Sequence, residues 1–169
     1  MTTIYGHTRE DVIRWPDDPA VRRTLEEYFD RFPVGSRTVE SLLDAEGLDF
    51  SGADLSGLDL LQAEFSGANL SGVRLVGADL YAAWLIGAVL RGADLSGCFL
   101  RKAQGRACDA QGAILRGADL QRSEFEDADF RRADFPSVVA GLIEDHSGFA
   151  DMADARHERR PFVYRRIVR

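Results

Sequence analysis

Carboxylates recur at regular spacing in the middle of this chain, and they are the first residues that could do chemistry. Eight aspartates are separated by multiples of five residues: Asp49, Asp54, Asp59, Asp79, Asp94, Asp119, Asp129 and Asp134. Clustered carboxylates can bind a cation or act as a general acid and base. Aspartates that recur with a structural repeat more often accept hydrogen bonds from nearby turn amides. We therefore interpret most of them as part of the scaffold.

The other groups that catalysis needs do not cluster along the sequence. His7, His146 and His157 all stand outside the run of aspartates, and Cys98 and Cys108 match no zinc or disulfide spacing. No Ser–His–Asp, Cys–His or metal-ligand arrangement can be assembled from the spacing. The sequence predicts no enzyme, no cofactor and no metal site.

Length and charge narrow the class of protein further. The chain has 169 residues, 45% of them hydrophobic and 29% charged, and a net charge of −7. One domain with small appendages is expected. The negative charge disfavours direct binding to nucleic acid, which needs lysine and arginine against phosphate. No apolar run is long enough to span a membrane, so we expect a cytoplasmic protein with no membrane contact.

An apolar residue recurs every five positions, from Phe50 to Phe135, and sixteen of these eighteen residues are Leu or Phe. A second series, mostly small residues, lies two positions earlier, from Leu48 to Ala133. A period of five fits neither a helix nor a flat strand. It predicts a chain that turns a corner after each repeat, with both residues pointing inward. Four repeats then close a square coil of 20 residues, stacked on its neighbours at about 4.8 Å.

Glycine is sorted by face, which supports the 20-residue coil. It stands two positions after the large residue on consecutive faces, as at Gly52 and Gly57, but never on the face of Leu60. That face has Gln62 and Ala82 instead. Because glycine permits positive φ, the pattern predicts a different turn type on that side.

The core lacks bulk at two consecutive steps, Gly105 and Ala110. In a 20-residue coil their upper neighbours are Phe125 and Phe130, so we expect the rings to lean into the space. The alternative is a loop or bulge between Lys102 and Gly112. Cys98 and Cys108 are expected to be small core residues on opposite sides of one coil.

The A-(D/N)-L-x-x pattern, seen in Ala53-Asp54-Leu55 and Ala118-Asp119-Leu120, resembles the pentapeptide-repeat family. The resemblance covers residues 48–137 and implies an all-β solenoid, a right-handed quadrilateral β-helix of about 4.5 coils. Some members of that family mimic B-DNA, bind DNA gyrase and protect it from inhibitors. Others have different roles, so the resemblance predicts the fold more specifically than the function.

The two ends are expected to cap the solenoid. Residues 1–47 predict a helical cap: a short helix from Thr8 to Trp15, a second starting at Asp18–Pro19 and stopped by Pro33 and Gly35, and a further turn through Val39, Leu42 and Leu43. Residues 138–169 predict a short helix over 137–145 and a basic extended tail. In the topoisomerase-targeting members of the family, C-terminal residues build a twofold dimer, so the resemblance makes Phe162, Tyr164 and Ile167 candidates for a homodimer contact.

Two surface features are candidates for binding a protein. Large apolar residues occupy outward positions and define an apolar patch, consisting of Leu61, Tyr81, Trp84, Ile86 and Phe99. Either a partner or the chain's own termini would cover it. Outward aspartates are candidates for an acidic surface: Asp54, Asp59, Asp79, Asp94, Asp119 and Asp134. Residues 48–87 carry a net charge of −4, whereas residues 88–137 are neutral.

These features support two functions. The first is a DNA-mimicking binder of DNA gyrase or another type II topoisomerase that confers resistance or self-protection against topoisomerase inhibitors. The second is an interaction scaffold or regulator that binds an unrelated protein through the apolar patch. The arginines among the acidic rows and the neutral second half count against the first.

Overall fold

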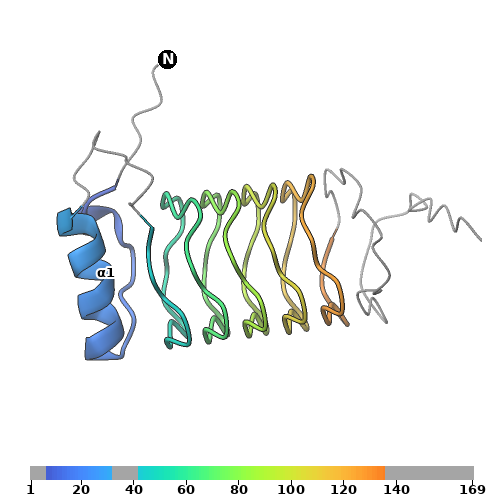
Figure 1. Ribbon diagram of the computed structural model, residues 1–169, viewed down its shortest axis with the longest axis horizontal. Helices are drawn as coiled ribbons and strands as arrows, with labels where there is room; N and C mark the ends of the chain where they lie inside the picture. Colours follow the sequence, from blue (N-terminus) through green and yellow to red (C-terminus); the bar gives the residue numbers. More distant parts are fainter. Residues whose placement is uncertain (1–6, 32–41, 136–169) are drawn as a thin grey trace, which may run out of the picture.

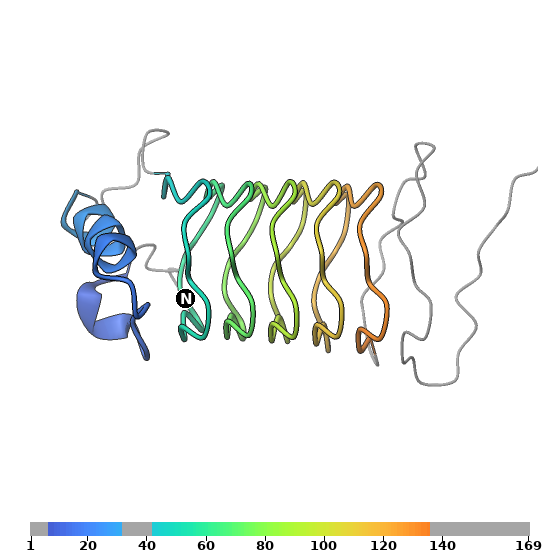
Figure 2. The same ribbon diagram turned by 90° about the horizontal axis from the view of Figure 1, so that it is seen from below.

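A computed structural model describes residues 7–31 and 42–135, and the coils lie side by side in a row with a helix at one end (Figure 1, Figure 2). Residues 43–135 form a right-handed quadrilateral β-helix, as predicted. Parallel bridges join residues 20 positions apart, from Asp44 with Glu64 to Ile114 with Asp134. The amide of Phe65 donates to the carbonyl of Trp84 at 2.8 Å, and the amide of Trp84 donates to Ala63 at 2.9 Å. The predicted coil of 20 residues is therefore confirmed.

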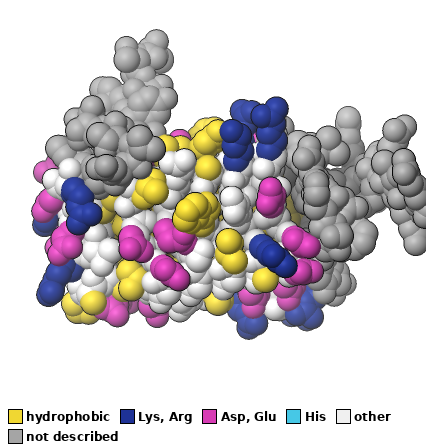
Figure 3. All heavy atoms as spheres, in the orientation of Figure 1, with side chains coloured by type: hydrophobic (Ala, Val, Ile, Leu, Met, Phe, Trp, Pro, Cys, Tyr) yellow, Lys and Arg dark blue, Asp and Glu magenta, His cyan; other side chains and the backbone are white. Residues whose placement is uncertain are grey.

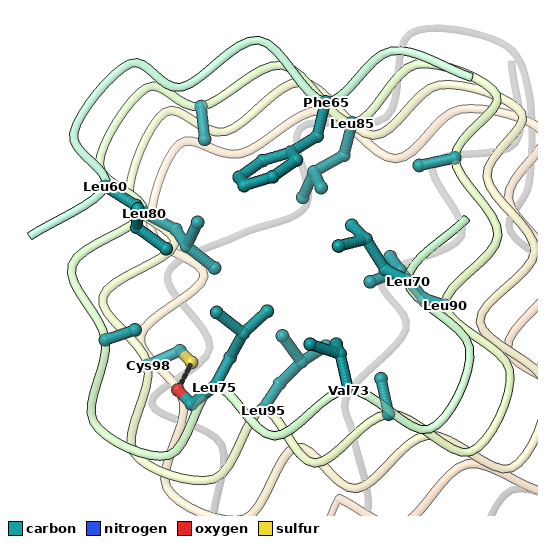
Figure 4. Packing of buried hydrophobic residues seen from close by; sticks show 14 of the residues in the cluster. Leu60, Phe65, Leu70, Val73, Leu75, Leu80, Leu85, Leu90, Leu95 and Cys98 are labelled. Carbon is teal, nitrogen blue, oxygen red and sulfur yellow. Dashed lines mark hydrogen bonds between the residues drawn. The ribbon is translucent and has the colours of Figure 1, made fainter. Parts of the chain in front are cut away.

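The core is a set of vertical stacks inside the coils. Leu60 lies next to Leu80, Phe65 next to Leu85, and Leu70 next to Leu90, all pointing toward the axis (Figure 4). The large residues and the small residues two positions before them are almost fully buried along the solenoid. Such close packing excludes water and makes the interior sensitive to a change of one methylene.

Every side of the coil uses the same corner, which corrects the prediction of a different turn on the Leu60 face. Each corner is a turn in which an amide donates to the carbonyl three residues earlier, as Ala63 does to Leu60 at 3.0 Å. The third residue of the turn has positive φ whether it is glycine or not. Gln62 has φ 55° and Ala82 has φ 54°, against 68° for Gly52. Backbone pairing to the next coil fixes this geometry, so non-glycine residues tolerate the strain.

The weak point of the core is filled as predicted at Gly105. A Cβ placed on Gly105 would lie 2.0 Å from Cε1 of Phe125, so the ring occupies the space of the missing side chain. The backbone pairing continues there, with the amide of Gly105 donating to Glu124 at 2.7 Å and that of Ala110 to Asp129 at 2.8 Å. The alternative of a bulge between Lys102 and Gly112 is wrong.

The N-terminal segment closes the first coil with one helix and one extended stretch. Helix α1, Pro19–Arg31, begins where predicted: the carboxylate of Asp18 accepts from the amide of Ala20 at 2.7 Å. Its buried face consists of Val21, Leu25 and Phe29, which join the same apolar cluster as the solenoid core. This packing covers apolar side chains that the first coil would otherwise expose.

The segment before α1 differs from the predicted helix. Only a 3-10 turn, η1 (Arg9–Asp11), follows the Thr8 cap. The chain then runs extended, and Arg14 pairs with Asp54 in an antiparallel bridge. The Nδ1 atom of His7 accepts from the amide of Asp59 at 2.8 Å. The first coil has free edge amides that need acceptors, which explains why backbone pairing prevails over a helix here.

The solenoid also starts one repeat earlier than the sequence predicted. Leu43 and Ala45 are buried inward residues, and the amide of Glu64 donates to the carbonyl of Leu43 at 2.8 Å. The helical turn predicted through Leu42 and Leu43 is therefore wrong. The remaining predictions on Pro33, Gly35 and Val39, and all those on residues 136–169, lie outside the described residues.

The contact between Gly105 and Phe125 can be tested by a double-mutant cycle. Gly105→Ala should lower the free energy of unfolding by about 1–3 kcal/mol, because its methyl group overlaps the ring. Phe125→Leu should also destabilise, by roughly 1 kcal/mol or more, because it leaves a void. The double variant should be more stable than the sum of the two costs implies, by about 1 kcal/mol. Additive costs, measured by denaturant unfolding, would contradict the packing.

The strained corners can be tested with a matched pair of exchanges. Ala82→Gly keeps the left-handed backbone but removes its steric cost, which is about 1–2 kcal/mol for a residue with a Cβ atom. The gain is offset by roughly 0.4–1 kcal/mol, because glycine gives the unfolded chain more conformational freedom. Ala82→Gly should therefore raise the melting temperature slightly. Gly72→Ala should lower it by a similar amount, since a Cβ there meets no atom within 4 Å and only the backbone strain changes. Shifts of the same sign for both variants would refute the explanation.

Candidate protein-binding surface

The described residues hold no metal-ligand cluster, and their two cysteines are buried. They contain no group of three or more His, Cys, Asp or Glu side chains placed to hold a metal ion. Cys98 and Cys108 are buried free thiols, and the Sγ of Cys98 donates to the carbonyl of Leu75 at 2.6 Å (Figure 4). Burial raises the pKa of each thiol to about 12, so neither forms a reactive thiolate near neutral pH.

The outward aspartates mainly hold the corners. The side chain of Asp79 accepts a hydrogen bond from the amide of Tyr81 at 2.9 Å, and that of Asp94 accepts from the amide of Ser96 at 3.1 Å. Asp49 does the same for Ser51, and its pKa is lowered first of all by that amide. This bond to the residue two positions on is the scaffold role predicted from the sequence.

Two of the six candidates for an acidic surface are not on the surface. Asp54 and Asp59 are only 6% and 8% exposed, because the N-terminal segment covers them. The backbone of Asp54 pairs with Arg14, while the carbonyl of Asp59 accepts from the hydroxyl of Tyr28 at 3.3 Å. The prediction of an acidic surface is wrong for these two residues.

Arginines pair with the aspartates in the second half of the solenoid. Arg116 contacts Asp134 at 2.6 Å, and Arg101 lies 3.9 Å from Asp119. The same offset of 18 residues joins Arg91 to Asp109 at 2.5 Å. Exposed pairs of this kind contribute little stability, about 0–1 kcal/mol each. Their main effect is to lower the negative potential along rows that a DNA mimic would need to be acidic.

Asp79, Asp94 and Glu64 differ from those aspartates in their surroundings. Among residues 7–31 and 42–135, no Lys or Arg side chain forms an ion pair with any of the three. All three residues are intermediate in exposure. Asp49 and Glu124, nearer the two ends of the solenoid, also form no ion pair among the described residues, so such carboxylates are spread along it; Glu64 and Asp79 are the two that lie beneath Trp84 and Phe99.

Glu64 and Asp79 adjoin the apolar patch. The ladder positions are the outward residues that bridge successive coils, and Trp84, Val89 and Phe99 occupy three of the four in one coil. Trp84 bridges Glu64 below it, and Phe99 bridges Asp79 below it. In the coil below, all four ladder residues are polar, namely Glu64, Asn69, Arg74 and Asp79. Three of the four apolar ladder residues in the described solenoid are thus in a single coil, and the fourth, Ile114, is in the next coil.

The patch wraps around one corner of the solenoid. Trp84 and Phe99 are 44% and 53% exposed and stand on adjacent sides, and Ile86 at the next corner is 42% exposed. Leu61 and Tyr81, one above the other at the shared corner, are partly covered. Figure 3 shows one face of the molecule, on which hydrophobic side chains lie among acidic ones and basic side chains gather toward the edges. The predicted patch is therefore brought together.

A cation already lies on this aromatic surface. The Nζ of Lys102 is 5.3 Å from the centre of the Tyr81 ring, within the range of a cation–π contact. Aromatic side chains beside unpaired carboxylates favour a partner that carries both apolar and basic groups. Exposed Ile13 (67%), in the N-terminal segment, is a further apolar side chain that sequence reasoning missed, because a helix was predicted there.

Comparison with known proteins places the fold in a family. The profile described as pentapeptide repeats matches in eight copies, over residues 49–85, 74–104, 83–122 and 106–136. No curated protein matches the chain at a significant level. No helix among the described residues is long and apolar enough to cross a membrane.

Solved structures of pentapeptide repeat proteins are similar in fold. Rfr23 from the cyanobacterium Cyanothece 51142 is 22% identical over 72% of this chain and 90% of that chain, with a TM-score of 0.53. A protein from the Arabidopsis thaliana thylakoid lumen is 31% identical over 57% of this chain and 70% of that one, with a TM-score of 0.46. QnrB1, a plasmid-mediated fluoroquinolone resistance protein, is 18% identical over 66% and 61%, with a TM-score of 0.45.

Proposed function

We propose that this chain, which belongs to the pentapeptide-repeat family, is a binding module that captures a protein partner on the apolar patch around Trp84 and Phe99. The observation that carries the proposal is the exposure of these two aromatic side chains, 44% and 53%, at adjacent sides of one corner. Exposed aromatic residues clustered at one place are typical of the centre of a protein interface.

The β-helix fold does not require Trp84 and Phe99 at their ladder positions. An aspartate at a ladder position accepts a hydrogen bond from the turn amide two residues on, as Asp79 does. Tryptophan and phenylalanine cannot accept that bond, which contributes about 0.5–1.5 kcal/mol. Nor do the described residues bury the rings in exchange. Residues that cost stability without improving the packing are expected at functional sites.

Partner capture should depend on the patch and not on the fold. Trp84→Ala and Phe99→Ala should each abolish capture of the partner by the tagged full-length protein, followed by mass spectrometry of the bound proteins. Each should change the free energy of unfolding by no more than about 1 kcal/mol, because the side chains are exposed. Ile13→Ala, at an apolar residue with 67% exposure outside the patch, is the matched control and should bind as the wild type does.

Two outcomes would reject this function. The first is recovery of the same proteins in the same amounts with both patch variants. The second is a large loss of stability in Trp84→Ala, since it would place the ring in the protein's own packing rather than at an interface.

A second candidate is a DNA-mimicking binder of DNA gyrase or another type II topoisomerase, acting in resistance or self-protection. The net charge of −4 over residues 48–87 favours it, because a carboxylate-bearing rod can enter a basic groove meant for a duplex. The ion pairs of Asp109, Asp119 and Asp134 count against it. The apolar patch therefore remains the better-supported binding surface.

A gyrase supercoiling assay separates the two functions. A DNA mimic should inhibit supercoiling, or protect it from a quinolone, at micromolar protein. Asp79→Asn should weaken that effect while keeping the turn hydrogen bond, whereas Asp119→Asn, at an already paired carboxylate, should change little. The absence of both inhibition and protection by the wild type would exclude this candidate.

A further inference from the structure

The apolar patch has the chemistry to bind a peptide with both arginines and apolar side chains. Trp84, Tyr81 and Phe99 offer ring faces, and Glu64 and Asp79 lie beneath two of them without an ion pair among the described residues. Guanidinium groups stack on such rings and pair with carboxylates at the same time. The contact of Lys102 with Tyr81 is an example of a cation on this surface.

The sequence of the chain itself contains a segment with this chemistry. Residues 156–169 read RHERRPFVYRRIVR, with six arginines and one glutamate around Phe162, Tyr164 and Ile167. Its positive charge is complementary to the carboxylates of Glu64 and Asp79, which lie beneath Trp84 and Phe99 and form no ion pair among the described residues. Pro161 restrains the backbone and lowers the entropic cost of binding in an extended form.

The segment can reach the patch from the end of the solenoid. Phe135 and Phe99 are 36 residues apart, which is less than two coils and about 10 Å along the axis. The 20 residues between Phe135 and Arg156 can span up to roughly 70 Å. Reach therefore does not restrict which side of the solenoid the segment meets.

We propose that residues 156–169 occupy the apolar patch of the same chain and thereby compete with the partner. This proposal rests on the proposed function of the patch and adds a way of regulating it. A partner must displace the segment, and a partner that also presents arginines beside apolar residues would do so. Linkage in one chain gives an effective concentration of about 1 mM, so a segment with a dissociation constant of about 300 µM would cover the patch in about three quarters of the molecules.

Tryptophan fluorescence of the full-length protein tests the contact. In a Trp15→Phe background, Trp84 is the only tryptophan and reports on the patch. The triple variant Phe162→Ser, Tyr164→Ser and Ile167→Ser should shift its emission to longer wavelength and raise its quenching by acrylamide about twofold. A synthetic peptide of residues 156–169 should reverse both changes with half-saturation near 300 µM. A scrambled peptide of the same composition should not.

The matched control uses the same tail variant with the other reporter. In a Trp84→Phe background, Trp15 packs against Phe29 in the N-terminal segment, outside the patch, so its quenching should be unchanged. High salt should raise the quenching of Trp84 in the wild-type tail, because screening weakens the arginine contacts.

Two results would overturn the proposal. Unchanged quenching of Trp84 in the tail variant would show that the segment does not cover the patch. Protection that grows with protein concentration would assign the occupant to a second copy rather than to the same chain. Neither result bears on the proposed function, which is tested separately by partner capture with the Trp84→Ala and Phe99→Ala variants and by the stability of Trp84→Ala.

Discussion

The parallel pairing of residues 20 positions apart is the constraint on which the rest of the structure depends. An amide such as that of Phe65 finds the carbonyl of Trp84 only if every coil has the same length and every corner the same turn. The pairing therefore imposes a positive φ at each corner, even on Gln62 and Lys102. It also prevents a local insertion, which is why the loss of bulk at Gly105 is met by the Phe125 ring and not by a bulge. Where the conformational preference of a single residue conflicts with the backbone pairing between coils, the backbone pairing determines the structure.

The same constraint explains what the sequence could predict. The inward residues obey the repeat, so the coil length follows from spacing and the fold from the family pattern, whereas spacing left both the Gly105–Phe125 packing and a bulge open. The turn type on the Leu60 face did not follow, because residue preference is a weak guide where neighbouring coils fix the backbone. The repeat at Leu43 and Ala45 was missed since alanine stands at the large inward position. The extended pairing of Arg14 with Asp54 depends on a contact 40 residues away that no local pattern reports.

The sequence predicted which residues form the apolar patch, but not the charge and burial of the residues around it. Trp84 and Phe99 stand out in the sequence because they replace an expected aspartate. Whether a carboxylate on the solenoid surface is neutralised depends on ion pairs such as that of Arg91 with Asp109. These two residues are 18 positions apart and lie on successive coils, so the pair can be recognised only once the coil length is known. The burial of Asp54 and Asp59 likewise follows from a cap whose conformation the sequence did not reveal. Charge counting alone therefore overstated the acidic surface.

A solenoid with a filled interior has to bind on its convex outside. Its core is packed with side chains from every coil, and among the described residues no cluster is arranged for a metal ion. On a convex surface, affinity comes from a few large side chains and from the charges around them rather than from enclosure. Substitution at a ladder position is the least disruptive way to place such a side chain, since it changes neither the core nor the backbone pairing. The aromatic residues at 84 and 99 lie in one coil, above Glu64 and Asp79 of the coil before it, whose carboxylates form no ion pair among the described residues, and together they meet both requirements. Exposed aromatic side chains of this kind are usually covered by a binding partner. The arginine-rich residues 156–169 suit that role, because their charge is complementary to the carboxylates beside the rings.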